Sequence, residues 1–208
     1  MMLRSAQSLW LTLNDHLLGI STGDRDATGA IPAWRGSASQ ASCYRDNLSY
    51  STPDYYYIHK VLKILQPGSE DVVYDIGCGK GRFLCRAARL RVKKCVGIEL
   101  LPELAEIASE NANQLRGRVA PIEIRCIDAA RADVSGGTIY FLFNPFGAET
   151  LATVLDNIHG SLVCQPRSVR IVYYNPACAN IVESAQWLRC YCSFRTFNRL
   201  EVRFYRSV

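Results

Sequence analysis

Hydrophobic residues follow two alternating patterns along the chain from residue 52 onward. Short apolar runs of five to seven residues alternate with stretches in which apolar residues recur every three or four positions. The first pattern is typical of strands buried on both faces of a sheet, and the second is typical of helices that cover such a sheet. We therefore expect a parallel sheet with helices on both faces.

The expected strands and helices share clear start and stop signals. A helix begins at Thr52-Pro53-Asp54, and another ends at Gly160. The expected strands are 72–76, 94–98, 122–127, 138–143 and 168–174. The expected helices lie at 52–65, 81–90, 102–115, 151–160 and, more weakly, 181–188. This order predicts an α/β, doubly wound, Rossmann-like fold.

The two ends of the chain depart from this alternation. Segments 191–197 and 200–205 flank Asn198, which suits a tight turn, so we expect a terminal antiparallel hairpin. Residues 21–49 carry Gly, Ser, Asp, Ala and Pro without periodicity. We divide the chain into a helical and loop-rich arm, residues 1–49, and a domain, residues 50–208.

Composition narrows the class of protein. Of 208 residues, 49% are hydrophobic and 21% charged, which is ordinary for a soluble globular protein. Nine cysteines without a C-x-x-C pair favour a reducing, cytoplasmic location and indicate no metal site. The apolar stretch 9–20 is too short to cross a bilayer, so no membrane contact is expected. The net charge of +5 includes a basic cluster at 82–94, which we interpret as a solvated helix face, with nucleic-acid binding as the alternative.

The most informative segment is a glycine loop, Asp75-Ile-Gly77-Cys-Gly79-Lys-Gly81-Arg82, between an expected strand and helix. Its third glycine comes one residue too early for a dinucleotide-binding G-x-G-x-x-G loop. Asp75 would repel a pyrophosphate but attract an ammonium group. S-adenosylmethionine carries an ammonium and a sulfonium, so this loop favours S-adenosylmethionine over a nicotinamide cofactor.

Two further acids end the next two strands. Glu99 follows Gly97-Ile98, where doubly wound sheets often bind ribose hydroxyls through a carboxylate. Asp128 follows Cys126-Ile127, within reach of an adenine amino group if the sheet is wound as expected. Acids at three consecutive strand ends indicate one shared ligand.

Together these motifs resemble those of the class I S-adenosylmethionine-dependent methyltransferases, over residues 50–208. The matching segments are D-I-G-C-G-K-G-R, G-I-E-L and D-A. The resemblance implies a seven-stranded sheet with an antiparallel last strand. It also implies a cofactor site that includes Asp75, Gly77, Cys78, Gly79, Gly81, Glu99, Leu100, Asp128 and Ala129. A poorly characterised group of small methyltransferases extends the similarity through L-G-I-S-T (18–22), Y-S-T-P (50–53) and F-L-F-N-P-F-G (141–147).

Two other segments resemble functional motifs. By similarity to non-SET histone-lysine methyltransferases, Tyr50 and Thr52 help to close the cofactor site; a helix cap and an aromatic plug are the alternative roles. Asn144-Pro145-Phe146 resembles the N-P-P-Y/F motif of amino-methyltransferases, although one proline is missing. That similarity places Asn144 and Phe146 against a methyl-accepting nitrogen, whereas a strand-ending Asn-Pro turn explains the segment without a substrate.

The sequence thus predicts an S-adenosylmethionine-dependent methyltransferase whose acceptor is a protein, a small molecule or a nucleic acid. Positioning can supply most of the rate of methyl transfer, so none of the three histidines is assigned a role. A non-catalytic cofactor-binding or partner-binding module on the same fold is the alternative. An NAD(P)-dependent oxidoreductase is a second, less favoured alternative function. The oligomeric state stays open.

Overall fold

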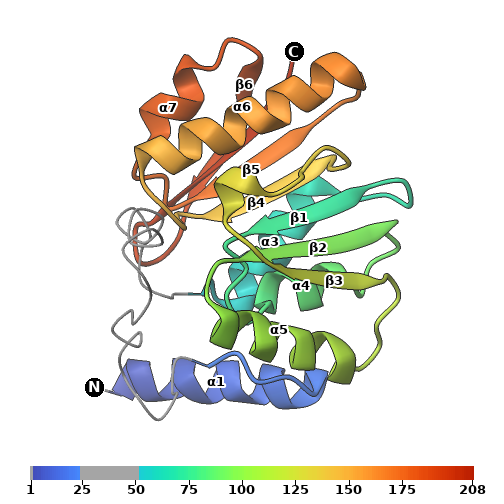
Figure 1. The fold of residues 1–208 in the computed structure, drawn as a ribbon. Helices are drawn as coiled ribbons and strands as arrows, with labels where there is room; N and C mark the ends of the chain where they lie inside the picture. The colour runs from blue at the N-terminus through green and yellow to red at the C-terminus, as the bar shows by residue number, and fades with distance from the viewer. Residues whose placement is uncertain (1, 24–51) are drawn as a thin grey trace, which may run out of the picture.

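A seven-stranded sheet forms the centre of the protein, which we describe from a computed structural model covering residues 2–23 and 52–208 (Figure 1). The strands stand in the order β3-β2-β1-β4-β5-β7-β6. Their bounds are β1 (Val72–Ile76), β2 (Lys94–Glu99), β3 (Ile122–Cys126), β4 (Ile139–Phe143), β5 (Arg170–Tyr174), β6 (Leu188–Arg195) and β7 (Glu201–Ser207). The first five pair in parallel, and β7 runs antiparallel to both β5 and β6. The expected fold class is confirmed, including the terminal hairpin.

Helices cover both faces of this sheet, since successive side chains of each buried strand point to opposite sides. The helices are α1 (Met2–Leu18), α3 (Tyr55–Leu65), α4 (Arg82–Ala87), α5 (Pro102–Gln114), α6 (Ala148–Cys164) and α7 (Ala179–Ser184), with a 3₁₀ turn η1 (Ala129–Arg131). One hydrophobic cluster joins α3, α4 and α5 to the sheet, and a second joins α6 and α7 to its other face (Figure 1). Leu18 and Ile20, at the end of α1, are buried in the first cluster.

Several expected boundaries were wrong. The N-cap of α3 is Asp54, which accepts a hydrogen bond from the Tyr56 amide (2.9 Å), and not Thr52. Helix α6 continues through Gly160 to Cys164, because a glycine without positive φ merely weakens a helix. Strand β6 begins at Leu188, so the weak helix before it shrinks to α7.

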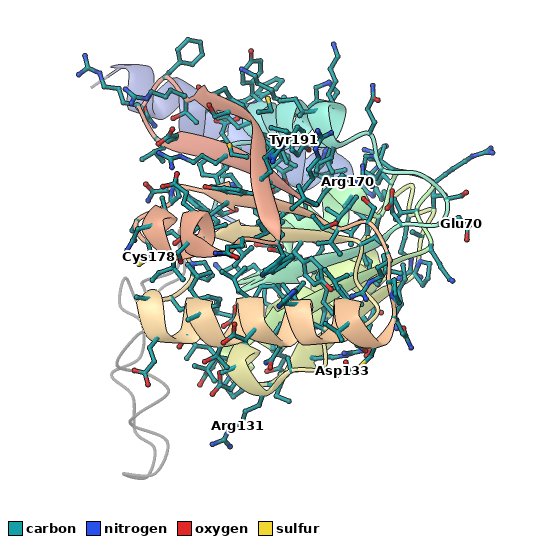
Figure 2. All side chains as sticks on the ribbon, turned by 90° about the horizontal axis from the view of Figure 1, so that it is seen from above. Glu70, Arg131, Asp133, Arg170, Cys178 and Tyr191 are labelled. Atoms are coloured by element: carbon teal, nitrogen blue, oxygen red, sulfur yellow. The ribbon has the colours of Figure 1, made fainter. Side chains whose placement is uncertain are left out.

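An ion pair joins the amino-terminal ends of two parallel strands, β5 and β1. Arg170, labelled in Figure 2 at the start of β5, donates to both carboxylate oxygens of Asp71 (2.7 Å each). Thr138 also donates to Asp71 (2.7 Å) and thereby joins the amino end of β4 to that of β1. The opposite, carboxyl edge carries the loops that the sequence marked as functional.

Within residues 2–23 and 52–208, no helix combines the length and apolar character needed to cross a membrane. The same residues contain no group of His, Cys, Asp and Glu arranged to hold a metal ion. The eight cysteines of this part of the chain are free thiols, and Cys78, Cys85 and Cys95 are buried.

Gly97, inside β2, allows α4 to pack directly on the sheet. A Cβ atom at this position would lie 2.5 Å from Leu84 Cδ1 and 2.8 Å from Cys78 Sγ, both buried. We expect Gly97→Ala to lower the free energy of unfolding by about 1–3 kcal/mol through overpacking, measured by urea denaturation. Gly160→Ala is the matched control, because nothing lies within 4 Å of its added Cβ. It should raise the free energy of unfolding by about 0.5–1 kcal/mol. An unchanged urea midpoint in Gly97→Ala would contradict this packing.

Candidate functional site

The site lies where the sheet order reverses. Strand connections run outward from β1 to β2 and β3 on one side, and from β4 to β5 on the other. In such sheets, the loops after the two central strands diverge and leave a crevice at the carboxyl edge. In this protein the two loops also make one close contact near their start, since a Cβ on Gly77 would lie 2.4 Å from Pro145 Cβ. Glycine at position 77 therefore allows this close approach.

The glycine loop turns through three left-handed residues. Gly77, Gly79 and Gly81 have φ values of 77°, 53° and 79°, which residues with a side chain rarely adopt. The amides of Gly77 and Cys78 both donate to the Ile98 carbonyl, at 2.8 and 2.9 Å. The loop after β1 is thus fixed to the end of β2, as a ligand-binding loop requires.

Glu99 organises this loop from the end of β2. Its carboxylate accepts hydrogen bonds from the amides of Gly79 (2.7 Å), Leu100 (2.9 Å) and Leu101 (3.0 Å). Burial nevertheless raises the pKa of Glu99, against the effect of these three donors. A carboxylate has about four acceptor positions, so about one remains for a ligand hydroxyl. The role of Glu99 in shaping the loop was not predicted.

Asp75 is the least satisfied acid of the site. Its side chain is buried, with an exposed fraction of 3%, and it accepts no hydrogen bond within the described residues. Burial, together with the nearby charge of Glu99, raises the pKa of Asp75 well above its usual range. A buried carboxylate without partners is costly, and a cationic ligand would lower that cost.

The remaining expected cofactor ligands differ in exposure. Asp128 is half-buried and caps η1 by accepting from the Ala130 amide (2.9 Å), and Ala129 is also half-buried. Leu100 is half-buried beside Glu99. The Cys78 side chain packs inward, and burial raises the pKa of its thiol, so Cys78 offers a ligand its backbone and not a thiolate. Thr52 is half-buried, and Tyr50 lies outside the described residues.

The acceptor side holds Asn144, which has a left-handed φ of 42° in the turn after β4. Its Oδ1 accepts a hydrogen bond from the Tyr173 hydroxyl (3.3 Å), and its side chain is half-buried. Phe146 is buried in the hydrophobic cluster beneath α6, where packing alone accounts for its ring. The contact of both residues with an acceptor stays a prediction.

Sequence reasoning missed a buried polar network behind the glycine loop. Arg82, expected on a solvated face, is buried instead. Its guanidinium donates to the Thr22 hydroxyl (2.6 Å), the Thr22 carbonyl (2.9 Å) and the Pro53 carbonyl (3.3 Å). Asp15 of α1 lies 3.9 Å away and accepts from the Thr22 amide (2.6 Å) and from the Tyr55 hydroxyl. The first residue of α4 therefore binds both segments that flank residues 24–51.

Two more polar side chains hold the segment before residue 24. Asn111 of α5 donates to the carbonyls of Ser21 and Lys80 (2.9 Å each) and accepts from the Ser21 amide (2.8 Å). Lys80, inside the glycine loop, donates to the Gly23 carbonyl (2.9 Å). The recurrence of L-G-I-S-T and Y-S-T-P in one protein group was the only signal in the sequence that these segments belong to the site.

We expect Arg82→Met to lower the free energy of unfolding by about 3–5 kcal/mol, because it leaves Asp15 buried without its cation. Arg89→Met, on the exposed end of the same basic cluster, is the matched control and should change stability by about 0.5 kcal/mol or less. Thermal unfolding followed by circular dichroism measures both. Equal melting temperatures for the two variants would contradict a structural role for Arg82.

Comparison with known proteins supports these observations. A family model described as a methyltransferase domain matches residues 73–163. Over 103 residues the chain is 30% identical to a protein-lysine N-methyltransferase of Saccharolobus islandicus (strain REY15A). That alignment covers 48% of this chain and 62% of the relative, so the chain spans less than two thirds of the relative's length. An uncharacterised Methanocaldococcus jannaschii protein, MJ0284, is 35% identical over 63 residues, which are 30% of this chain and 27% of that protein.

Solved structures share the fold at low sequence identity. An RNA methyltransferase from Salinibacter ruber, in complex with S-adenosyl-L-homocysteine, aligns with a TM-score of 0.54 at 23% identity, over 76% of this chain and 92% of that one. A ribosomal protein L11 methylase from Lactobacillus delbrueckii subsp. bulgaricus aligns with a TM-score of 0.58 at 16% identity, over 76% and 80%. With the sheet order and the glycine loop, these findings show that residues 73–163 match a methyltransferase domain and that the chain has the fold of solved methyltransferases.

Proposed function

We propose that the protein binds S-adenosylmethionine at the carboxyl ends of β1 to β3 and transfers its methyl group to an acceptor nitrogen beside β4. The observation that carries this proposal is the buried carboxylate of Asp75 behind the glycine loop, which accepts no hydrogen bond from the residues that the structure describes. The cofactor's amino-acid ammonium is the cation that this carboxylate needs, and bound cofactor supplies a methyl group on a sulfonium. Residues 50–208 would carry the activity.

The other site residues fit the remaining parts of the cofactor. Gly79 has a left-handed φ and no side chain, so a ligand can approach the loop backbone closely there. Glu99 would accept from a ribose hydroxyl with the one acceptor position left by its three amides. Asp128 would accept from the adenine amino group, with Leu100 and Ala129 on either side of the ring. Tyr50 and Thr52 would close the site.

A lysine amine of a protein is the acceptor that we favour. The relative from Saccharolobus islandicus is a protein-lysine N-methyltransferase, which supports a protein nitrogen. Asn144 Oδ1 has two lone pairs and, among the described residues, receives one hydrogen bond, from Tyr173, so it can accept a second from an acceptor N–H. Phe146 would support this turn from below. The buried free thiols of Cys85 and Cys95 suit a reducing compartment such as the cytoplasm.

Asp75→Asn should increase the stability of the free protein and weaken cofactor binding. The raised pKa of Asp75 means that its contribution to stability is present at low pH and is lost as pH rises through the folded-state pKa. Removing the charge should therefore raise the free energy of unfolding by about 1–3 kcal/mol near pH 8, and by less near pH 5. Thermal unfolding between these pH values measures the difference, and calorimetric titration with S-adenosylhomocysteine measures the affinity. A variant that is less stable at every pH, with unchanged affinity, would refute the assignment.

The cofactor itself is tested by calorimetric titration with S-adenosylhomocysteine, using NADH as the control ligand. We expect saturable binding of the first ligand only. Glu99→Gln should weaken this binding by about tenfold, as the loss of one charged hydrogen bond predicts. Glu99→Ala is less suitable, because it leaves all three loop amides unpaired, whereas the side-chain oxygen in Glu99→Gln can still accept from the amides of Leu100 and Leu101. Binding of NADH would instead support an oxidoreductase.

Activity requires a separate measurement, since binding alone is also expected of a non-catalytic module. Purified protein is incubated with methyl-labelled S-adenosylmethionine and unmodified lysine-containing proteins, and label is located by mass spectrometry. We expect label on lysine nitrogen. Tight cofactor binding without transfer of the labelled methyl group to protein, nucleic acid or small molecules would favour a non-catalytic cofactor-binding module.

A further inference from the structure

The basic cluster of residues 82–94 is divided by the fold. Arg82 is buried behind the glycine loop, and the other basic members are half-buried or exposed. The exposed members, all in the loop between α4 and β2, are Arg89, Arg91 and Lys93. Residues 76–98 contain no Asp or Glu. The exposed part of the cluster therefore has no acidic neighbour along the chain.

A second loop brings two more arginines to the same edge of the sheet. Arg116 and Arg118 are exposed in the loop between α5 and β3. The amides of Val119 and Ala120 donate to the Ala88 carbonyl (2.8 and 2.9 Å), so this loop is fixed to the end of α4. Both loops precede a parallel strand and lie at the amino edge of the sheet, opposite the glycine loop. We define the amino-edge basic surface as Arg89, Arg91, Lys93, Arg116 and Arg118.

The side chains of this surface are held in place but not neutralised. The Arg89 guanidinium lies against the second loop, since a Cβ on Gly117 would be 3.2 Å from Arg89 Nε. The guanidinium groups of Arg116 and Arg118 donate to backbone carbonyls near the ends of α1 (3.2 Å) and α5 (3.0 Å). These bonds orient the side chains and leave their charges in place. None of the ion pairs within residues 2–23 and 52–208 includes a member of the surface.

Arg86 indicates independently that this end of α4 favours an anion. Arg86 is half-buried, and its Nε atom is buried without a hydrogen-bond partner among the described residues. Burial, together with the positive charge of Arg89 three residues further along, lowers the pKa of Arg86. Two arginines that repel each other are costly for the folded protein, and a bound anion beside them would lower that cost.

The composition of the surface favours the phosphate groups of a nucleic acid. Four of its five members are arginines, whose planar guanidinium groups match the geometry of phosphate oxygens. Five cations without ion-pair partners suit a chain of phosphates better than a single phosphate. The surface contains no aromatic side chain, so it favours contacts to the phosphate backbone over stacking on bases.

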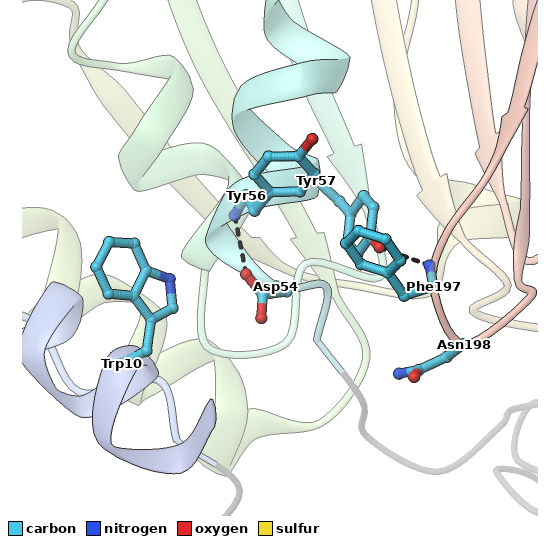
Figure 3. A pocket seen from close by; sticks show the side chains of 6 residues that line it. All are labelled: Trp10, Asp54, Tyr56, Tyr57, Phe197 and Asn198. Atoms are coloured by element: carbon cyan, nitrogen blue, oxygen red, sulfur yellow. Dashed lines mark hydrogen bonds between the residues drawn. The ribbon is translucent and has the colours of Figure 1, made fainter. Parts of the chain in front are cut away.

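An aromatic groove offers the opposite combination (Figure 3). Its lining residues are Trp10, Asp54, Tyr56, Tyr57, Phe197 and Asn198. These include four rings but no Arg or Lys, so the groove suits unpaired bases better than phosphates. A double helix encloses its bases and exposes its phosphates. A duplex should therefore prefer the amino-edge basic surface, whereas a single strand should prefer the groove.

We propose that the amino-edge basic surface binds the phosphate backbone of a double-helical nucleic acid without reading its sequence. This inference does not depend on the proposed methyl transfer, because the surface and the cofactor loop lie at opposite edges of the sheet. A protein held in this way keeps its carboxyl edge open to cofactor and acceptor. Duplex DNA and duplex RNA present the same phosphodiester groups, so the test includes both.

The test measures binding of the full chain to short labelled duplexes by fluorescence anisotropy at several salt concentrations. We expect a Kd of about 10⁻⁶ to 10⁻⁴ M at physiological salt. Neutralising about four phosphates of DNA should give a slope of about −4 for log K against log salt. The duplex that binds more tightly identifies the source of the phosphates. No binding at low salt, or tighter binding of a single strand of the same length, would overturn the proposal.

Three variants locate the binding surface, with thermal unfolding as the check that each is folded. Arg89→Met and Arg91→Met each remove one charge from the surface, so each should weaken duplex binding and reduce the salt slope by about 1. Arg189→Met removes the same charge from an exposed position on β6, at the far edge of the sheet, and should leave the slope unchanged. Equal effects of all three variants would mean that only net charge matters and would overturn the proposal.

Two other polyanions and one cofactor analogue complete the test. Polyglutamate presents carboxylates, and phosphatidylserine vesicles present an anionic lipid surface. If either binds more tightly than the duplex and loses affinity in Arg89→Met, the surface belongs to an acidic protein or a membrane, and the proposal is wrong. S-adenosylhomocysteine should bind the wild type and Arg89→Met equally. If it binds neither while the duplex binds as expected, the proposed methyl transfer fails and the present inference stands.

Discussion

The buried guanidinium of Arg82 is the interaction on which the arrangement of this protein depends. A buried charge is tolerated only where it is paired and hydrogen-bonded. Arg82 meets this condition only because Asp15, Thr22 and Pro53 converge on it from distant parts of the chain. Since Arg82 is also the first residue of α4, directly after the glycine loop, the positions of α1 and α3 are coupled to the shape of that loop.

The carboxyl edge of the sheet combines two kinds of acid with opposite effects on stability. Glu99 accepts hydrogen bonds from three backbone amides, which use most of its acceptor positions, and it thereby fixes the loop. Within residues 2–23 and 52–208, Asp75 accepts no hydrogen bond, and it lies close enough to Glu99 for the two charges to repel. A fold selected for stability alone would not keep an unpaired carboxylate in that position. Its presence is explained if a cationic ligand completes the site, which is the usual trade between stability and function.

The sequence alone predicted the sheet, its terminal hairpin and the glycine loop, because these depend on local patterns. Strand periodicity and a run of glycines are visible within ten residues. The partners of Arg82 are not, because they depend on which distant segments meet behind the loop, and a basic residue in a cluster is more often solvated. The predictions that α3 is capped at Thr52 and that α6 ends at Gly160 were wrong for a related reason. Local signals there compete with one another, and tertiary packing decides the outcome.

The polar network and helix α3 are connected through two consecutive residues. The Pro53 carbonyl accepts a hydrogen bond from Arg82 (3.3 Å), and Asp54, the next residue, caps α3 by accepting from the Tyr56 amide. The same short segment thus contacts the polar network on one side and begins a helix on the other. Because the donor to Pro53 is a buried, charged side chain that directly follows the glycine loop, a shift of α3 relative to that loop must break a charged hydrogen bond.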